Sequence, residues 1–437
     1  MAITPKLQLL LESGEQLPGY FWIAGQPDQA VGGVLRWSVS EGARLTILGA
    51  LSKKYVRPSQ PELTIHGRAT ADGAKVTLPT ALLASATFGS GLETKFVDST
   101  LLLEDHVSTD SKWKTLILRT AYLHEWLPIT GFLPPTFEMK GGQTVRYSEN
   151  WKAPRGIWAR LADAGLRFGA RMDTELSLQP ERSIRTALDL TIKTAEHESL
   201  PALHRRYAVP LANLMTVVAG RPDRIIYEAA LRGSRRTVAL RRATVDVAPR
   251  EWRPGRELLF YARQLPDSRG AIQDWFELHR RCSPAIEVFS YAINQQPVYS
   301  AAELLNVASA LETYHRVVHE AKWVQAWKTA NPGKKPGGHP YLIERIADLQ
   351  SFSGVSEKAT GLSEANRKLL VASRNHYAHL SEPSYGFTSD QVRDGTPDSI
   401  RRAVVLMQAC LMKELGFDAA AIDERLTAHY REWPVPQ

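Results

Sequence analysis

Residues Ser373–His379 read SRNHYAH and bring an arginine, an amide and two histidines into one short segment. The segment falls in a predicted helix over 363–380, which should end there because Pro383 follows closely. A helical period places four apolar side chains on one stripe of this helix: Leu369, Leu370, Tyr377 and Leu380. The stretch therefore predicts a helix that packs on one face and carries polar chemistry near its C-terminal end.

Helical patterns extend to both sides of this segment. We expect helices near 285–294, 300–327, 338–352, 363–380, 397–415 and 419–432. The 300–327 helix should begin with a capping box, because Ser300 is followed three residues later by Glu303. A later helix is expected to start at Pro397. Residues 285–437 are therefore predicted to form an all-α helical bundle.

The N-terminal part has a different pattern. Short runs rich in β-branched and aromatic residues recur between turn signals over 1–195, which is typical of a sandwich or barrel. Residues 196–284 mix strand and helix patterns, and a short helix over 270–282 should break at Pro284. We predict a multidomain chain with an all-β N-terminal domain over 1–195, a mixed α/β connector over 196–284 and the helical domain over 285–437.

The composition is that of an ordinary globular protein of 437 residues, 43% hydrophobic and 23% charged. Two cysteines without metal spacing predict no disulfide framework, and no apolar run approaches the ~18 residues of a membrane span. Without a recognisable signal peptide, a cytoplasmic location is expected. The net charge of +8 favours a polyanionic partner such as RNA. Nucleotide-binding and hydrolase motifs are absent, so we expect no cofactor and no metal.

The opening segment contains groups that can cleave RNA. RNA carries its own nucleophile, the 2′-hydroxyl, so no metal is required. His379 can transfer protons near neutral pH, and the guanidinium of Arg374 can stabilise the charged phosphorane. The expected products are a 2′,3′-cyclic phosphate and a 5′-hydroxyl end. Asn375 lies one helical turn before His379, so its amide could orient the imidazole.

Spacing alone does not single out this pair. The same arginine-to-histidine spacing occurs between Arg119 and His124, at the end of a predicted strand. In a continuous helix, Arg374 and His379 lie about 140° apart, at roughly 100° per residue. They would meet at one phosphate only if the helix loosened near its end or if a second subunit completed the site. The geometry therefore predicts a homodimer with the two motif helices at its interface.

The C-terminal region resembles a HEPN domain through the RN-x3-H segment Arg374–His379, and in particular the HEPN domain of ApeA-type anti-phage proteins. Residues Leu311–Arg316 resemble the early helix of that group, and Gly19–Gly25 and Leu45–Leu51 look like its N-terminal region. The resemblance implies a metal-independent endoribonuclease that acts in abortive infection. It also implies a homodimer through the HEPN domain.

The resemblance further implies roles for individual residues. Arg374 and His379 match the catalytic positions of the family, and Asn375 matches its frequent polar residue after the arginine. His376 and Glu312 are supporting candidates. The substrate would be RNA, with tRNA as one candidate. The β-rich region would act as a sensor or regulator for a phage-derived trigger.

Other interpretations stay open from the residues. Glu312, His315 and His319 place a carboxylate and two imidazoles on one side of a helix, a pattern that can bind a metal, although no further ligand is identifiable. Asp72 and the Glu93–Lys95 segment have the bare form of a metal-dependent nuclease, but in a β-rich setting. The alternative function is a non-catalytic interaction protein, with a β-sandwich recognition module and a helical dimerisation domain.

Overall fold

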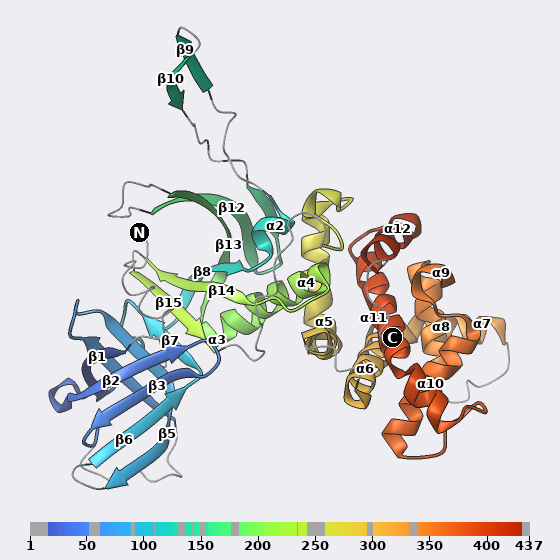
Figure 1. Ribbon diagram of the computed structural model, residues 1–437, viewed down its shortest axis with the longest axis horizontal. Helices are drawn as coiled ribbons and strands as arrows, with labels where there is room; N and C mark the ends of the chain where they lie inside the picture. The colour runs from blue at the N-terminus through green and yellow to red at the C-terminus, as the bar shows by residue number, and fades with distance from the viewer. Residues whose placement is uncertain are drawn as a thin grey trace.

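The computed structural model has a β-rich half and a helical half that lie next to each other along the longest axis (Figure 1). It describes residues 16–51, 62–88, 92–108, 110–128, 136–140, 143–148, 152, 154, 156–175, 183–233, 235–242, 258–294, 300–331 and 340–430. The predicted fold class, a β-rich region followed by an all-α region, is confirmed.

The β-rich half contains a six-stranded barrel. Its strands and those that follow are β1 Leu17–Ile23, β2 Val31–Ser38, β3 Gly42–Leu48, β4 Leu63–Ala69, β5 Lys75–Phe88, β6 Leu92–Asp98, β7 Thr100–Leu103, β8 Trp113–Thr120, β9 Thr136–Lys140, β10 Gln143–Ser148, β11 Ile157–Arg160, β12 Ala164–Glu175, β13 Ser183–Glu198, β14 Ile225–Arg232 and β15 Arg235–Arg241. The antiparallel order β5-β4-β1-β2-β3-β6 closes because β6 also pairs with β5. Closure removes the free edges that an open sheet would expose.

An open sheet continues from the barrel through β7. Its order is β7-β15-β14-β8-β13-β12-β11, and β12 and β13 are strongly curved (Figure 1). The short helix α2, Leu123–Trp126, contacts β8 and β13, and the short helix α3, Leu200–Leu203, follows β13. Strands β14 and β15 come from the predicted connector over 196–284, yet they pair with β8 and β7. The predicted domain limits at 195 and 284 stay predictions, but the sheet itself extends to Arg241.

The barrel interior follows from side-chain alternation. In β1, the inward positions include Phe21, which is 1% exposed, whereas its neighbour Tyr20 is 57% exposed. Gly67 on β4 lies against the ring of Phe21, because a Cβ atom there would be only 2.5 Å from Phe21 Cδ1. The small residue therefore allows the large aromatic ring to fill the centre of the barrel.

Of the remaining helices, the first lies between β13 and β14, and the others follow the last strand. They are α4 Val209–Ala219, α5 Ser268–Asn294, α6 Ala301–Val318, α7 Glu320–Ala330, α8 Leu342–Ser353, α9 Glu357–Thr360, α10 Glu364–His379, α11 Ser389–Glu414 and α12 Ala419–Tyr430, with the short turns η1 Pro27–Gln29, η2 His204–Ala208 and η3 Ala262–Gln264. As predicted, Ser300 caps α6, since its side chain accepts a hydrogen bond from the Glu303 amide.

The predicted helix break before Pro284 is present as a kink, and two other helix predictions were wrong. Cys282 leaves helical geometry (φ −127°, ψ 25°), so α5 consists of two helical segments joined at a kink directly before Pro284. The predicted 300–327 helix is divided at His319 into α6 and α7. The helix expected to start at Pro397 begins at Ser389, because Thr388 and Gln391 form a capping box there.

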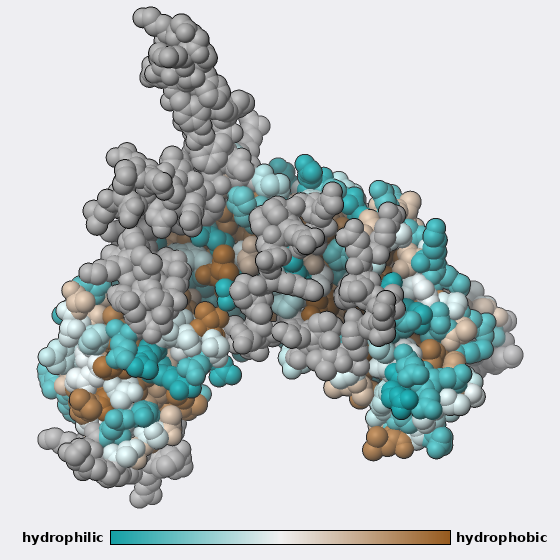
Figure 2. Space-filling view, viewed as in Figure 1, coloured by the Kyte–Doolittle hydropathy of each residue, from teal (hydrophilic) through white to brown (hydrophobic). Residues whose placement is uncertain are grey.

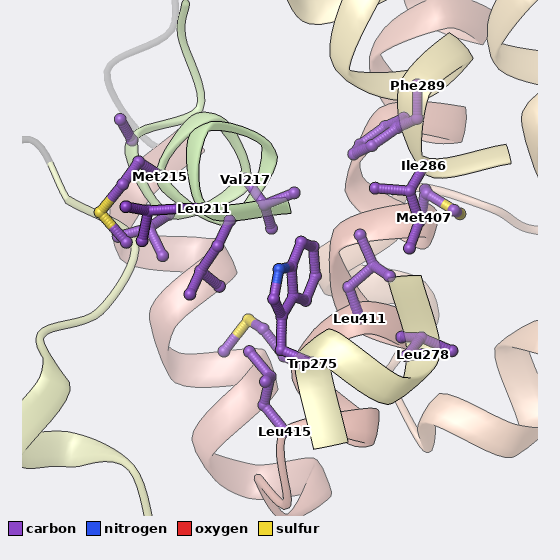
Figure 3. Close-up of a cluster of buried hydrophobic side chains, with 14 of the residues drawn as sticks. Leu211, Met215, Val217, Trp275, Leu278, Ile286, Phe289, Met407, Leu411 and Leu415 are labelled. Carbon is purple, nitrogen blue, oxygen red and sulfur yellow. The ribbon is translucent and has the colours of Figure 1, made fainter. Parts of the chain in front are cut away.

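One hydrophobic core joins the sheet to the helical bundle. Trp275 on α5 is fully buried and lies between side chains of α4 and α11, including Leu211 and Leu411 (Figure 3). Its indole N–H donates to the Pro210 carbonyl at 2.8 Å. Helix α5 thus connects the two halves through continuous packing, and a change in one half can displace elements of the other.

Candidate functional site

The SRNHYAH segment forms the last two turns of α10. Ser363 caps this helix by accepting a hydrogen bond from the Asn366 amide, and residues 370–373 are buried against the bundle. The prediction that Leu380 belongs to the apolar stripe was wrong. The helix ends at His379, Leu380 adopts a left-handed conformation (φ 50°), and its side chain is 90% exposed.

Arg374 is held by two neighbours. Its Nη2 donates to Glu312 Oε2 on α6 at 3.2 Å, and its Nη1 donates to Asn375 Oδ1 at 3.0 Å. The side chains of Arg374 and Glu312 are 27% and 25% exposed, so solvent screens the pair only in part. Glu312 also lies 3.6 Å from Arg316. The structure therefore places three of the five predicted site residues together: Arg374, Asn375 and Glu312.

The two histidines of the segment lie apart from this cluster. His379 is exposed and makes no hydrogen bond to the described residues. The expected pair between Asn375 and His379 is not formed, because the amide oxygen accepts from the charged guanidinium of Arg374. His376 Nδ1 donates to the Ser381 carbonyl at 2.6 Å and so fastens the following loop to the helix.

The helix does not loosen before its end. Helix α10 is continuous through His379, so Arg374 and His379 keep the separation of about 140° that five residues of helix impose. Within one protomer, the guanidinium and the imidazole therefore leave different sides of the same helix. The site can supply a phosphate-binding cation and a proton-transfer group, but at two separate places.

The alternative metal site on α6 is a buried hydrogen-bond network. Arg345 Nη1 donates to His315 Nδ1 at 3.0 Å, so the other ring nitrogen, Nε2, carries the proton and donates to Asp348 at 3.1 Å. Burial, assisted by the nearby Arg345 charge, lowers the pKa of His315 to about 4. The described residues contain no group of three or more histidine, cysteine and acidic side chains arranged to hold a metal ion.

His319 follows one turn later and is also neutral. Its ring centroid lies 4.2 Å from that of Phe352 on α8, and its Nε2 has no hydrogen-bond partner among the described residues. Burial is the main reason that its pKa is lowered to about 4. Both imidazoles thus contribute to packing and to internal hydrogen bonds of the bundle.

The other sequence candidates have structural partners. Arg119 on β8 donates from Nε and Nη2 to Asp189 Oδ1, at 2.9 and 2.8 Å, and stacks over Tyr227. Asp72 accepts from the Ala74 amide in a turn, at 2.9 Å. Lys95 forms an ion pair with Glu93 on the same strand, at 2.9 Å. These four side chains, those of Arg119, Asp72, Glu93 and Lys95, thus form structural contacts within the β-rich half.

The sequence did not reveal a cleft at the junction of the two halves. It measures about 840 Å³, and its buried floor includes Tyr207 and Phe276. Arg206 at its rim pairs with Glu198 at 2.9 Å and with Asp163. The lining comes from segments that are far apart in the chain, so no local pattern indicates the cleft.

Comparison with known proteins gave two matches. The model for ApeA N-terminal domain 1 matches residues 17–225, and the model for Apea-like HEPN matches residues 305–421. The first range begins with β1 and reaches β14, and the second contains Glu312 and all of α10. No curated protein and no solved structure showed a match. No described helix has both the length and the apolar character needed to cross a membrane.

Proposed function

Because the chain is an ApeA-like protein with a C-terminal HEPN domain, we propose that it is a metal-independent endoribonuclease that acts in anti-phage defence by abortive infection. The observation that carries this proposal is the ion pair between Arg374 and Glu312 inside the HEPN match. The pair holds a partly exposed guanidinium on the helix that also presents the exposed His379.

The proposed reaction uses the 2′-hydroxyl of RNA as the nucleophile. His379 accepts the 2′-hydroxyl proton while the 2′-oxygen bonds to phosphorus, and the bond to the 5′-oxygen breaks as that oxygen takes a proton from water. Arg374 donates to the non-bridging oxygens, where negative charge develops. Glu312 and Asn375 position the guanidinium by the hydrogen bonds described above. The products are a 2′,3′-cyclic phosphate and a 5′-hydroxyl end.

We propose that two copies of the chain form each active site. Arg374 and His379 lie about 140° apart around a continuous helix, so a second α10 packed beside the first can supply the missing group. The homodimer would therefore assemble through the HEPN domain. RNA, with tRNA as one candidate, would bind where the two helices meet.

A regulatory role for the β-rich region also belongs to this proposal. Helix α5 packs against the sheet side and contacts α6 and α11, so it links the region that would sense a phage-derived trigger to the helix that carries Glu312. The junction cleft lies along the same helix.

The test is induced expression with sequencing of cut RNA ends. The wild-type protein should be toxic and leave cyclic phosphates, and Arg374→Ala and His379→Ala should each abolish both effects. Arg393→Ala is the matched control, because Arg393 is an exposed arginine paired with Asp390 on α11. Equal toxicity of all four proteins would overturn the proposed activity.

Mixing the two inactive variants tests the composite site. In a heterodimer of Arg374→Ala with His379→Ala, one composite site carries both substitutions and the other carries neither. Random pairing should thus restore about a quarter of wild-type cleavage. A site built within one protomer would stay inactive in every pairing.

The separation of Arg374 and His379 also favours a second candidate function. A helical domain in which these groups never converge could serve only for dimerisation, with the β-rich region as a recognition module. This non-catalytic interaction protein would form dimers, yet its expression would produce no cut RNA.

A further inference from the structure

The loop after the motif helix contains unusual backbone conformations. Leu380 and Tyr385 have φ values of 50° and 61°, and only one other described non-glycine residue, Glu104, has a positive φ. Residues Ser384–Phe387 form a turn in which the Phe387 amide lies 3.4 Å from the Ser384 carbonyl. Both central positions have positive φ, which is the type I′ pattern that favours glycine, asparagine and aspartate. A tyrosine at the first of these positions is strained.

This strain is not offset by burial. The side chain of Tyr385 is 50% exposed and that of Leu380 is 90% exposed. The hydrogen bond from His376 to the Ser381 carbonyl fixes the loop directly after His379. Figure 2 shows apolar surface among hydrophilic residues at the lower tip of the helical half. Strained backbone positions whose side chains stay largely exposed are often functional.

Cleavage by a 2′-hydroxyl requires alignment of the attacking oxygen, phosphorus and the leaving oxygen. A nucleotide in a stacked A-form helix does not have this alignment, so the nucleotide at the cut must leave the stack. Unstacked bases in RNA are commonly held on aromatic side chains. A half-exposed ring on the loop that directly follows the proton-transfer histidine is suited to that task.

We propose that the loop over 380–388 binds the unpaired base next to the cut, with the ring of Tyr385 as the stacking surface. The substrate class is therefore single-stranded RNA or an RNA loop. The inference rests on the proposed RNA cleavage at Arg374 and His379. A second protein copy is a less suitable occupant, because two exposed apolar side chains offer far less area than a stable interface buries.

The test compares Tyr385→Asn with Tyr385→Phe. Asparagine tolerates the left-handed backbone, so that variant should keep or increase its thermal stability while losing the ring. Loss of one base–aromatic stack should lower kcat/KM on single-stranded RNA by about 5- to 100-fold. Phenylalanine keeps the ring and should stay within about twofold of the wild type.

A binding measurement separates this inference from the proposed activity. The probes are single-stranded 2′-O-methyl oligonucleotides, which lack the 2′-hydroxyl nucleophile and cannot be cut. Each probe carries 2-aminopurine at a different position along the strand. Fluorescence at one position should be quenched by the wild type and by Tyr385→Phe, and not by Tyr385→Asn. The inference would be overturned if Tyr385→Asn quenched the probe and cleaved RNA as the wild type does. It would also be overturned if the substitution changed only the oligomeric state of the protein. If Arg374→Ala and His379→Ala cut RNA like the wild type, the proposed activity fails instead.

Discussion

Replacement of His319 by phenylalanine should make the helical bundle more resistant to acid. His319 is 5% exposed, and its pKa is lowered to about 4, mainly by burial. The unfolded chain has the ordinary value of 6.5, so between pH 6.5 and 4 it binds a proton that the folded chain does not. The free energy of unfolding therefore falls as pH falls through this window. At about 1.4 kcal/mol per pH unit, the loss at pH 5 is about 2 kcal/mol.

Phenylalanine cannot take up this proton. It should fit beside Phe352, and no hydrogen bond of His319 Nε2 is lost, since that atom has no partner in the part of the chain that the structure describes. We expect the variant to lie within ~1 kcal/mol of the wild type at pH 7 and to be about 2 kcal/mol more stable at pH 5. Asp348 favours protonation of His319 whereas His315 and Lys322 oppose it, and all three remain in the variant.

Hydrogen exchange of α6 and α8 amides is the suitable assay, because a chain of this size unfolds in more than one step. His197→Phe is the control, since His197 is exposed on β13 and should show no gain at pH 5. Parallel loss of protection in the wild type and His319→Phe between pH 7 and 5 would refute the assignment of a buried neutral imidazole.

Three further predictions concern stability and can be measured by thermal denaturation. Arg345→Met should destabilise the bundle by about 3–5 kcal/mol, because it removes a guanidinium that is only 2% exposed, together with its ion pair to Glu320 and its hydrogen bonds. Adding Glu320→Gln should recover part of the lost stability, because it removes the carboxylate charge that Arg345 had balanced. Gly42→Ala should cost more than Gly73→Ala, since both have positive φ but only the Cβ at position 42 would meet backbone, at 2.5 Å. Leu380→Gly should stabilise by up to ~1 kcal/mol, because it relieves a left-handed leucine without removing buried surface.

Local sequence patterns predicted the class and order of the elements. Alternating and helical periods depend on neighbours within a few residues, so the change from strands to helices was readable. Closure of the barrel could not be predicted in this way, because the pairing of β5 with β6 depends on side chains that meet only after folding. The break expected at Pro284 is present as a kink at Cys282, because a proline ring disrupts the helix on its N-terminal side.

The candidate site was predictable only in part. The end of the motif helix near His379 followed from the proline shortly beyond it. The ion pair of Arg374 could not be predicted from local patterns. Its partner Glu312 lies 62 positions earlier and reaches Arg374 only because α6 packs on α10. The orientation of Arg374 also determines the partner of Asn375. The Asn375 oxygen accepts a hydrogen bond from Arg374, so the expected contact between Asn375 and His379 does not form.

The two catalytic groups of the proposed reaction are therefore oriented to different degrees. Arg374 is oriented by contacts inside the protomer, whereas His379 has a defined backbone position but no side chain among the described residues that orients its ring. A proton-transfer group gains most of its rate from orientation relative to the reacting atoms. Whatever orients His379, whether the second copy or the bound RNA, would then decide when the proposed cleavage can occur. The arrangement suits the proposed role in anti-phage defence, because assembly of the site can be withheld without unfolding either half of the protein.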